Sequence, residues 1–137
     1  MTILVTDSGF RTEERDWDFR PPDQLPAGQA GLAVELASDA DPTILSDHLH
    51  AIELIRVNFP EFADGRGFTI ARVLRLMGYG GRIRASGHVI ADQYAMSRRA
   101  GFDEVEIDDQ LAARQPEEQW LRRSNWQSHD YQARLRA

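Results

Sequence analysis

The sequence predicts an α/β domain with a mostly parallel, four-stranded βαβ sheet and a small N-terminal β-hairpin. The chain has 137 residues, of which 42% are hydrophobic, so it can form one domain with its own core. Short β-like runs alternate with helical stretches, and strands that are joined by helices pair in parallel. The four runs are Leu32–Leu36, Ile52–Phe59, Arg82–Gly87 and Asp103–Ile107.

The N-terminal part has a different pattern from the rest of the chain. Ile3–Val5 and Phe10–Thr12 flank a turn signal that contains Asp7 and Gly9, and a polar run with prolines follows. Residues 1–30 are therefore expected to form a hairpin and a linker. Residues 31–137 are expected to form a single α/β domain with a C-terminal helical tail. Whether its sheet is open or curves like part of a (β/α)₈ barrel is left undecided by the sequence.

Four helices are expected between and after the strands. The first begins at Asp41, an N-cap residue that is followed by a proline, and places Leu45 on its apolar side. The others span Arg66–Met77, Ala91–Ala100 and residues 116–124. Gly78 and Gly101 stand where left-handed residues end the second and third helices.

Composition excludes several classes of function. The formal charge of −6 argues against non-specific binding to nucleic acid or anionic membranes. Cysteine is absent, which excludes disulfides, thiolate chemistry and cysteine-ligated metals. All sixteen basic residues are arginines, so Schiff-base lysine chemistry is excluded too. The first residues have no basic leader and no apolar run could span a membrane, so a cytoplasmic protein is expected.

The loops after the strands hold the candidate ligand site, because ligands bind beyond the carboxyl ends of parallel strands. The turn around Arg66 and the turn from His88 to Gln93 are expected at the same rim of the sheet. Two glycines and an arginine before a helix suit a small oxyanion, and Arg84 is the natural second donor. The candidate ligand-binding residues are Asp64, Gly65, Arg66, Gly67, Arg84 and Gln93. In the structural alternative, Asp64 caps the helix, the glycines only permit the turn, and Arg66 or Arg84 pairs with Asp64 or Asp92.

His88 and Asp92 are the candidate catalytic residues, as an acid–base pair with Gln93 orienting a ligand. Asp92 is equally placed to cap the helix that follows it. His48 and His50 lie two residues apart and would point to different faces of a helix, so no metal site is expected. No Gly-x-Gly-x-x-Gly follows a strand, which argues against a tightly bound dinucleotide. A loosely bound flavin or nicotinamide nucleotide is left open.

The C-terminal tail is rich in large apolar side chains. These side chains either anchor an interface with another protein or fold back onto the sheet as its last helix. The sequence does not choose between the two. The residues are Trp120, Leu121, Trp126, Tyr131 and Leu135.

Several motifs together, and above all their order, make the chain recognisable. They are Phe59-Pro-Glu-Phe62-Ala-Asp64-Gly65-Arg66-Gly67-Phe68, Ala71-Arg72-Val73-Leu74-Arg75, Arg84-Ala85-Ser86-Gly87, Asp92-Gln93 and Gly101-Phe102-Asp103. This array resembles the bacterial domain-of-unknown-function family 934 from about Asp16 to Ile107. Ala100 stands where that family frequently has a cysteine, and His88 where an acid is common. The first departure argues against an obligatory thiol.

The resemblance implies a role in sulfur assimilation, since members of the family are described as oxidoreductases associated with sulfite reduction. The expected function is that of a cytosolic accessory protein or oxidoreductase component in assimilatory sulfite reduction, which binds a small sulfur oxyanion. Electrons would come from a separable cofactor or another protein. The alternative is a non-catalytic interaction module that docks on a sulfite reductase subunit through the C-terminal tail. Sulfite reductase or another sulfur-assimilation protein is the expected partner, and a homo-oligomer is left open.

Overall fold

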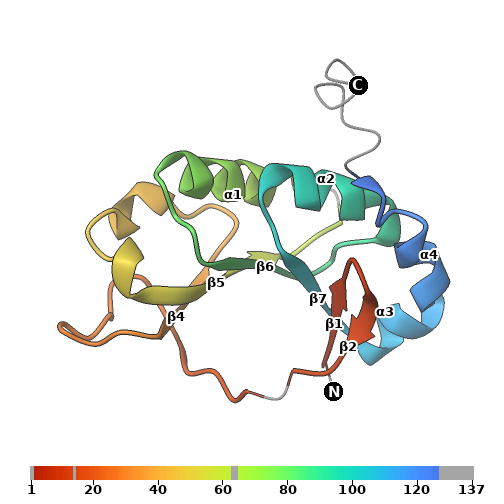
Figure 1. Ribbon diagram of the computed structural model, residues 1–137, viewed down its shortest axis with the longest axis horizontal. Coiled ribbons are helices and arrows are strands. Elements are labelled where there is room, and N and C mark those ends of the chain that lie inside the picture. Colours follow the sequence, from red (N-terminus) through yellow and green to blue (C-terminus); the bar gives the residue numbers. More distant parts are fainter. Residues whose placement is uncertain (1, 14, 63–64, 127–137) are drawn as a thin grey trace.

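A computed structural model describes residues 2–13, 15–62 and 65–126. An open β-sheet forms the middle of the fold (Figure 1). The apolar and β-branched runs of the sequence form its strands. They are β1 (Thr2–Thr6), β2 (Gly9–Arg11), β3 (Phe19–Arg20), β4 (Leu32–Leu36), β5 (Ile52–Phe59), β6 (Arg82–Gly87) and β7 (Glu104–Asp108). Their order across the seven-stranded sheet is β2-β1-β7-β6-β5-β4-β3.

The mostly parallel α/β sheet is confirmed, but the expected number of four strands is wrong. Strands β4 to β7 are the four expected runs, and each pairs in parallel with the next. The N-terminal hairpin continues the same sheet, because β1 pairs antiparallel with β7 and satisfies the backbone groups of that edge. The short strand β3 adds in parallel to β4 at the other edge.

Two helices cover one face of the sheet (Figure 1), α1 (Arg66–Leu76) and α2 (Tyr94–Ala100). The expected helix from Arg66 is confirmed, and its final turn is followed by Gly78 at φ +96°. The expected helix from Ala91 begins as the 3₁₀ turn η3 (Ala91–Gln93) and continues as α2 to Gly101, which has φ +121°. Both glycines occupy the left-handed region that ends a helix.

The first expected helix is replaced by two 3₁₀ turns, η1 (Pro42–Leu45) and η2 (Leu49–Ala51). Asp41 caps η1 as expected, because its carboxylate accepts a hydrogen bond of 3.0 Å from the Thr43 amide. Ile44 is 52% exposed, so this stretch buries too little apolar surface to hold a longer helix.

Two short helices follow β7 at the edge of the sheet, α3 (Asp109–Arg114) and α4 (Glu117–Leu121). The expected helix over 116–124 corresponds to α4, whereas α3 was not anticipated. Trp120 of α4 is buried edge-on against Tyr94, with ring centroids 6.1 Å apart. Trp120 therefore folds back onto the domain, which is one of the two placements expected for the apolar side chains of the tail. Tyr131 and Leu135 lie outside the described residues.

The face of the sheet under α1 and α2 forms the apolar core. An aromatic cluster closes this core at the carboxyl ends of the strands, where Phe59 lies 5.1 Å from Phe68 and 5.8 Å from Phe102 between ring centroids. None of the helices in the described ranges combines the length and the hydrophobicity that a membrane span requires.

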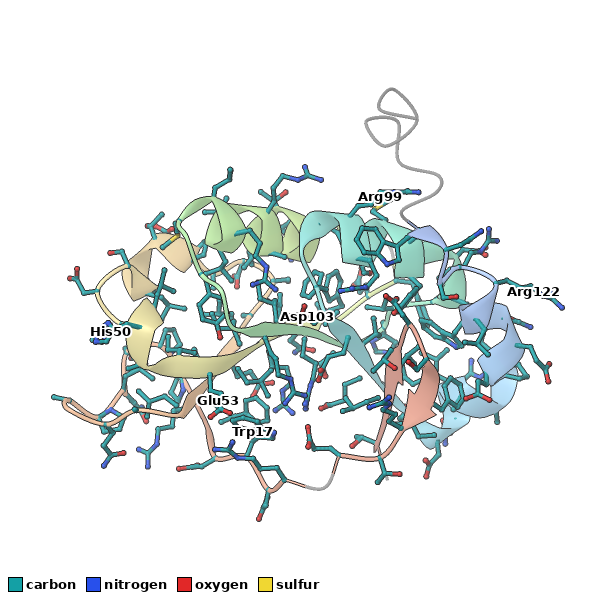
Figure 2. All side chains as sticks on the ribbon, in the orientation of Figure 1. Trp17, His50, Glu53, Arg99, Asp103 and Arg122 are labelled. Atoms are coloured by element: carbon teal, nitrogen blue, oxygen red, sulfur yellow. The ribbon has the colours of Figure 1, made fainter. Side chains whose placement is uncertain are left out.

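The opposite face carries charged side chains, because alternate residues of a strand point to opposite sides. An extended stretch, residues 12–13 and 15–18, runs along this face from β2 to β3 (Figure 1), and we call it the crossing segment. Its Trp17 ring lies against this face (Figure 2), with the guanidinium carbons of Arg15 and Arg82 at 3.8 and 5.7 Å from the ring centroid. The sheet thus has one apolar face under helices and one charged face under extended chain.

Replacing Gly67 by alanine is expected to destabilise the fold. A Cβ atom at this position would lie 2.4 Å from the tip of the Phe59 ring, which is held between two other phenylalanines. Such overpacking lowers the free energy of unfolding by about 1–3 kcal/mol. Gly80→Ala is the matched control, since a Cβ there meets nothing within 4 Å. Denaturant titration of both variants tests this, and equal stabilities would contradict it.

Candidate functional site

The carboxyl ends of β5, β6 and β7 meet at one rim of the sheet, and the loops that follow them are linked. The Gln93 side-chain amide donates a hydrogen bond of 2.8 Å to the Phe62 carbonyl oxygen. The His88 amide donates one of 2.9 Å to the Phe59 carbonyl oxygen. The loop before α1 and the loop before α2 therefore lie at the same rim, as the parallel topology predicts.

A pocket of about 310 Å³ opens at this rim, and we call it the rim pocket. It lies where β6 and β7 end and where α3 begins, the position at which parallel sheets commonly bind ligands. Its polar lining includes Ser86, His88, Glu106, Asp108, Gln110 and Arg114. Phe62, Ile107 and Leu111 supply apolar wall.

Glu106 links the rim pocket to the charged face of the sheet. Its carboxylate accepts hydrogen bonds from Arg84 Nη1 at 2.9 Å, Arg56 Nη1 at 3.3 Å and Ser86 Oγ at 3.1 Å. Three donors from two neighbouring strands thus fix the orientation of this carboxylate. Its charge is balanced by arginines that lie in the sheet itself.

Arg84 is the most deeply buried charge in the described part of the chain, with 1% of its surface exposed. Its Nε donates to Glu104 at 2.5 Å, its Nη2 to Glu13 at 2.5 Å and its Nη1 to Glu106 at 2.9 Å. We call these four residues the Arg84 cluster. Arg82 reinforces it with a hydrogen bond of 2.8 Å from Nη2 to Glu104.

The electrostatics of Glu13 reflect this arrangement. Burial raises the pKa of its carboxyl group, but hydrogen bonds from the Arg15 amide and from Arg84 outweigh that effect. The net pKa of Glu13 lies below its ordinary value. The crossing segment is therefore tied to the sheet by a carboxylate that favours its charged form.

The two arginines expected to share an oxyanion lie apart. Arg84 directs Nε and both Nη atoms to carboxylates on the face of the sheet that α1 does not cover. Arg66 Nη2 donates to Ser38 Oγ at 3.1 Å, beyond the end of β4. Arg84 thus pairs with carboxylates of the chain, but these are glutamates and not the Asp64 or Asp92 of the structural alternative.

The other residues expected to bind the oxyanion are held mainly by contacts within the fold. Gly65 is the N-cap residue of α1, and Gly67 is buried under Phe59. Asp64 lies outside the described residues. Both ends of the Gln93 side-chain amide are used in hydrogen bonds, because its Nε2 donates to Phe62 in the loop before α1 and its Oε1 accepts from the Ile90 amide at 3.0 Å.

His88 and Asp92 do not meet in the structure. The exposed His88 ring packs edge-on against Phe62, with centroids 5.0 Å apart, and lines the rim pocket. The Asp92 carboxylate accepts a hydrogen bond of 2.7 Å from Arg123 Nη2 instead. His88 is thus placed to contact a ligand without its expected proton partner.

Sequence reasoning missed Ser86, Glu106 and Arg114 as lining residues. Ser86 and Glu106 share the strand alternation of Arg84 and stand near the ends of parallel strands, so alternation could have identified them. Arg114 lies on α3, the helix that was not anticipated. Within the described ranges, no group of three or more histidine or acidic side chains could hold a metal ion.

Comparison with known proteins gives one match. Residues 33–137 match the family described as "Bacterial protein of unknown function (DUF934)". No curated protein and no solved structure matches the chain.

Replacing Arg84 by methionine is expected to lower the free energy of unfolding by about 3–5 kcal/mol, or to prevent folding, because three carboxylates lose their shared cation. The matched control is Arg20→Met. Arg20 pairs with Asp18 at 3.0 Å, but the two side chains are 45% and 77% exposed, so its loss changes stability by no more than about 1 kcal/mol. Chemical denaturation of the two variants measures the difference. Similar stabilities would show that burial of the cluster has little energetic effect.

Proposed function

The chain belongs to the bacterial family DUF934, and on that premise we propose that it is a cytoplasmic accessory protein of assimilatory sulfite reduction that binds a small sulfur oxyanion in the rim pocket. The process is the one that the family resemblance implies. The binding site is supported by one observation, the convergence of His88, Arg114 and Glu106 on a pocket at the carboxyl ends of parallel strands.

The chemistry of the lining suits an oxyanion that keeps a proton. Arg114 offers a planar fork of N–H donors, and no hydrogen bond or ion pair joins its side chain to another described residue. The His88 ring can donate a hydrogen bond to an oxyanion. Glu106 can accept a hydrogen bond from a ligand hydroxyl, because two arginines already balance its negative charge. Hydrogen sulfite combines the anionic oxygens and the hydroxyl that these groups would contact.

The expected affinity is modest. A hydrogen bond to a charged group contributes about 1.5–3 kcal/mol, and millimolar binding needs about 4 kcal/mol. Two or three such contacts therefore reach the millimolar range. The volume of about 310 Å³ leaves room for water around so small a ligand.

The contacts support binding more than catalysis. Asp92, the expected proton partner of His88, is ion-paired with Arg123 at 2.7 Å. The alternative of docking through the C-terminal tail has less support from Trp120, because that side chain is buried in the domain. We therefore favour an accessory protein that binds a small anion over an oxidoreductase that transforms it.

Titration with sulfite, followed by calorimetry or thermal shift, tests the proposed site. Arg114→Gln is expected to weaken sulfite binding by at least about fivefold, the equivalent of about 1 kcal/mol. Arg72→Gln is the matched control, since Arg72 is an exposed arginine on α1 outside the rim pocket. Sulfate is expected to bind more weakly than sulfite, because it has no proton to share with Glu106. Equal binding by both variants would remove the site.

A deletion strain tests the process. Growth of the strain is expected to need cysteine or sulfide and not to be restored by sulfite. An Arg114→Gln allele should restore growth less well than an Arg72→Gln allele. Undiminished growth of the deletion strain on sulfite would overturn the proposed role, whatever the titration shows.

A further inference from the structure

A second pocket lies between α2 and the end of α4 and shares no lining residue with the rim pocket. Its volume is also about 310 Å³. Arg99 of α2 and Arg122 and Arg123 after α4 line it, together with Asp92 and Met96. We call these five residues the arginine pocket.

The arginine pocket concentrates positive charge on an acidic chain. Three arginines and one aspartate give it a local charge of +2, whereas the whole chain carries −6. Figure 2 shows the Arg99 and Arg122 side chains pointing outward from the domain. Such local charge attracts acidic surfaces and lowers the affinity for basic ones.

Its arginines are largely available to a ligand. The Arg122 side chain is exposed, and its guanidinium forms no hydrogen bond or ion pair with any other residue that the structure describes. Arg99 uses Nη2 in a hydrogen bond of 3.2 Å to the Trp126 carbonyl oxygen, and is otherwise exposed. Arg123 pairs with Asp92, but both side chains are at least half exposed, so a stronger acidic partner could replace this contact.

The supporting helix is anchored at both ends. Glu117, at the start of α4, accepts a hydrogen bond of 2.8 Å from the Phe10 amide. Trp120 is buried, and its indole N–H donates to the Gln115 carbonyl oxygen at 2.8 Å. Arg122 and Arg123 therefore extend from a fixed backbone, which reduces the ordering that binding requires.

Met96 indicates the kind of ligand. It is 51% exposed within the arginine pocket, although a small free anion would leave its apolar surface in water. Methionine and arginine are both enriched at protein interfaces, where a second protein covers the apolar part. Carboxylates on such a protein would pair with the arginines bidentately.

We propose that the arginine pocket is a docking site for an acidic, partly apolar surface of another protein. Aspartate or glutamate side chains of the partner pair with Arg99 and Arg122, and an apolar partner side chain covers Met96. This site and the oxyanion site use different residues, so either one can fail without the other.

The probe is a short fluorescent peptide of glutamates interrupted by leucines, with lysines in place of glutamates in a control peptide. Fluorescence anisotropy with the full chain is expected to show salt-dependent binding of the acidic peptide and no binding of the lysine peptide. The double variant Arg99→Gln/Arg122→Gln should weaken this binding about tenfold. Arg11→Gln/Arg20→Gln changes the net charge equally at exposed positions outside the pocket, and should change binding less than about twofold.

Further measurements separate a protein partner from a free anion. Met96→Ser keeps every charge and is expected to weaken peptide binding about threefold. Its melting temperature is expected to change no more than that of a variant with a typical surface substitution. Equal losses in the two arginine double variants would overturn the site. Displacement of the peptide by millimolar inorganic phosphate, or tighter binding of a DNA oligonucleotide than of the peptide, would overturn the proposed protein partner.

Discussion

The buried guanidinium of Arg84 is the constraint on which the rest of this structure depends. A charge that is 1% exposed is tolerated only where opposite charges and hydrogen bonds replace water. Those partners come from distant parts of the sequence, Glu13 from the crossing segment and Glu104 and Glu106 from β7. The cluster therefore joins the N-terminal stretch to the centre of the sheet and orients the carboxylate that lines the rim pocket.

The two faces of the sheet contribute to the stability of the fold in different ways. The apolar face excludes water under α1 and α2 and supplies the hydrophobic stabilisation of the fold. The charged face contributes less net free energy to folding, because burying ions carries a large desolvation cost, but removing one of its partners would leave a buried charge uncompensated. Ser86 and Glu106, near the carboxyl ends of β6 and β7, line the rim pocket, whereas the Arg84 guanidinium donates to three carboxylates of the chain.

The sequence predicts the central strands well and their long-range partners poorly. Strands β4 to β7 are recognisable because each buries a continuous or alternating apolar run, and the helix from Arg66 has clear helical spacing. The pairing of the N-terminal hairpin with β7 joins segments about a hundred residues apart, and no local pattern encodes it. The same limit applies to the site. The Arg84 partner Glu13 lies 71 residues away in the sequence, so no local pattern pairs them. Arg114 lies on a helix of six residues that carries too weak a periodic signal.

A double-mutant cycle between Arg84 and Glu13 tests the central claim most directly, with Arg84→Met and Glu13→Gln measured singly and together by chemical denaturation. The account predicts that the double variant loses less free energy of unfolding than the sum of the singles, by about 0.5–3 kcal/mol. A parallel cycle between Arg20→Met and Glu13→Gln should show no coupling beyond about 0.3–0.5 kcal/mol. Additive effects in the first cycle would contradict the claim that this buried cation holds the crossing segment to the sheet.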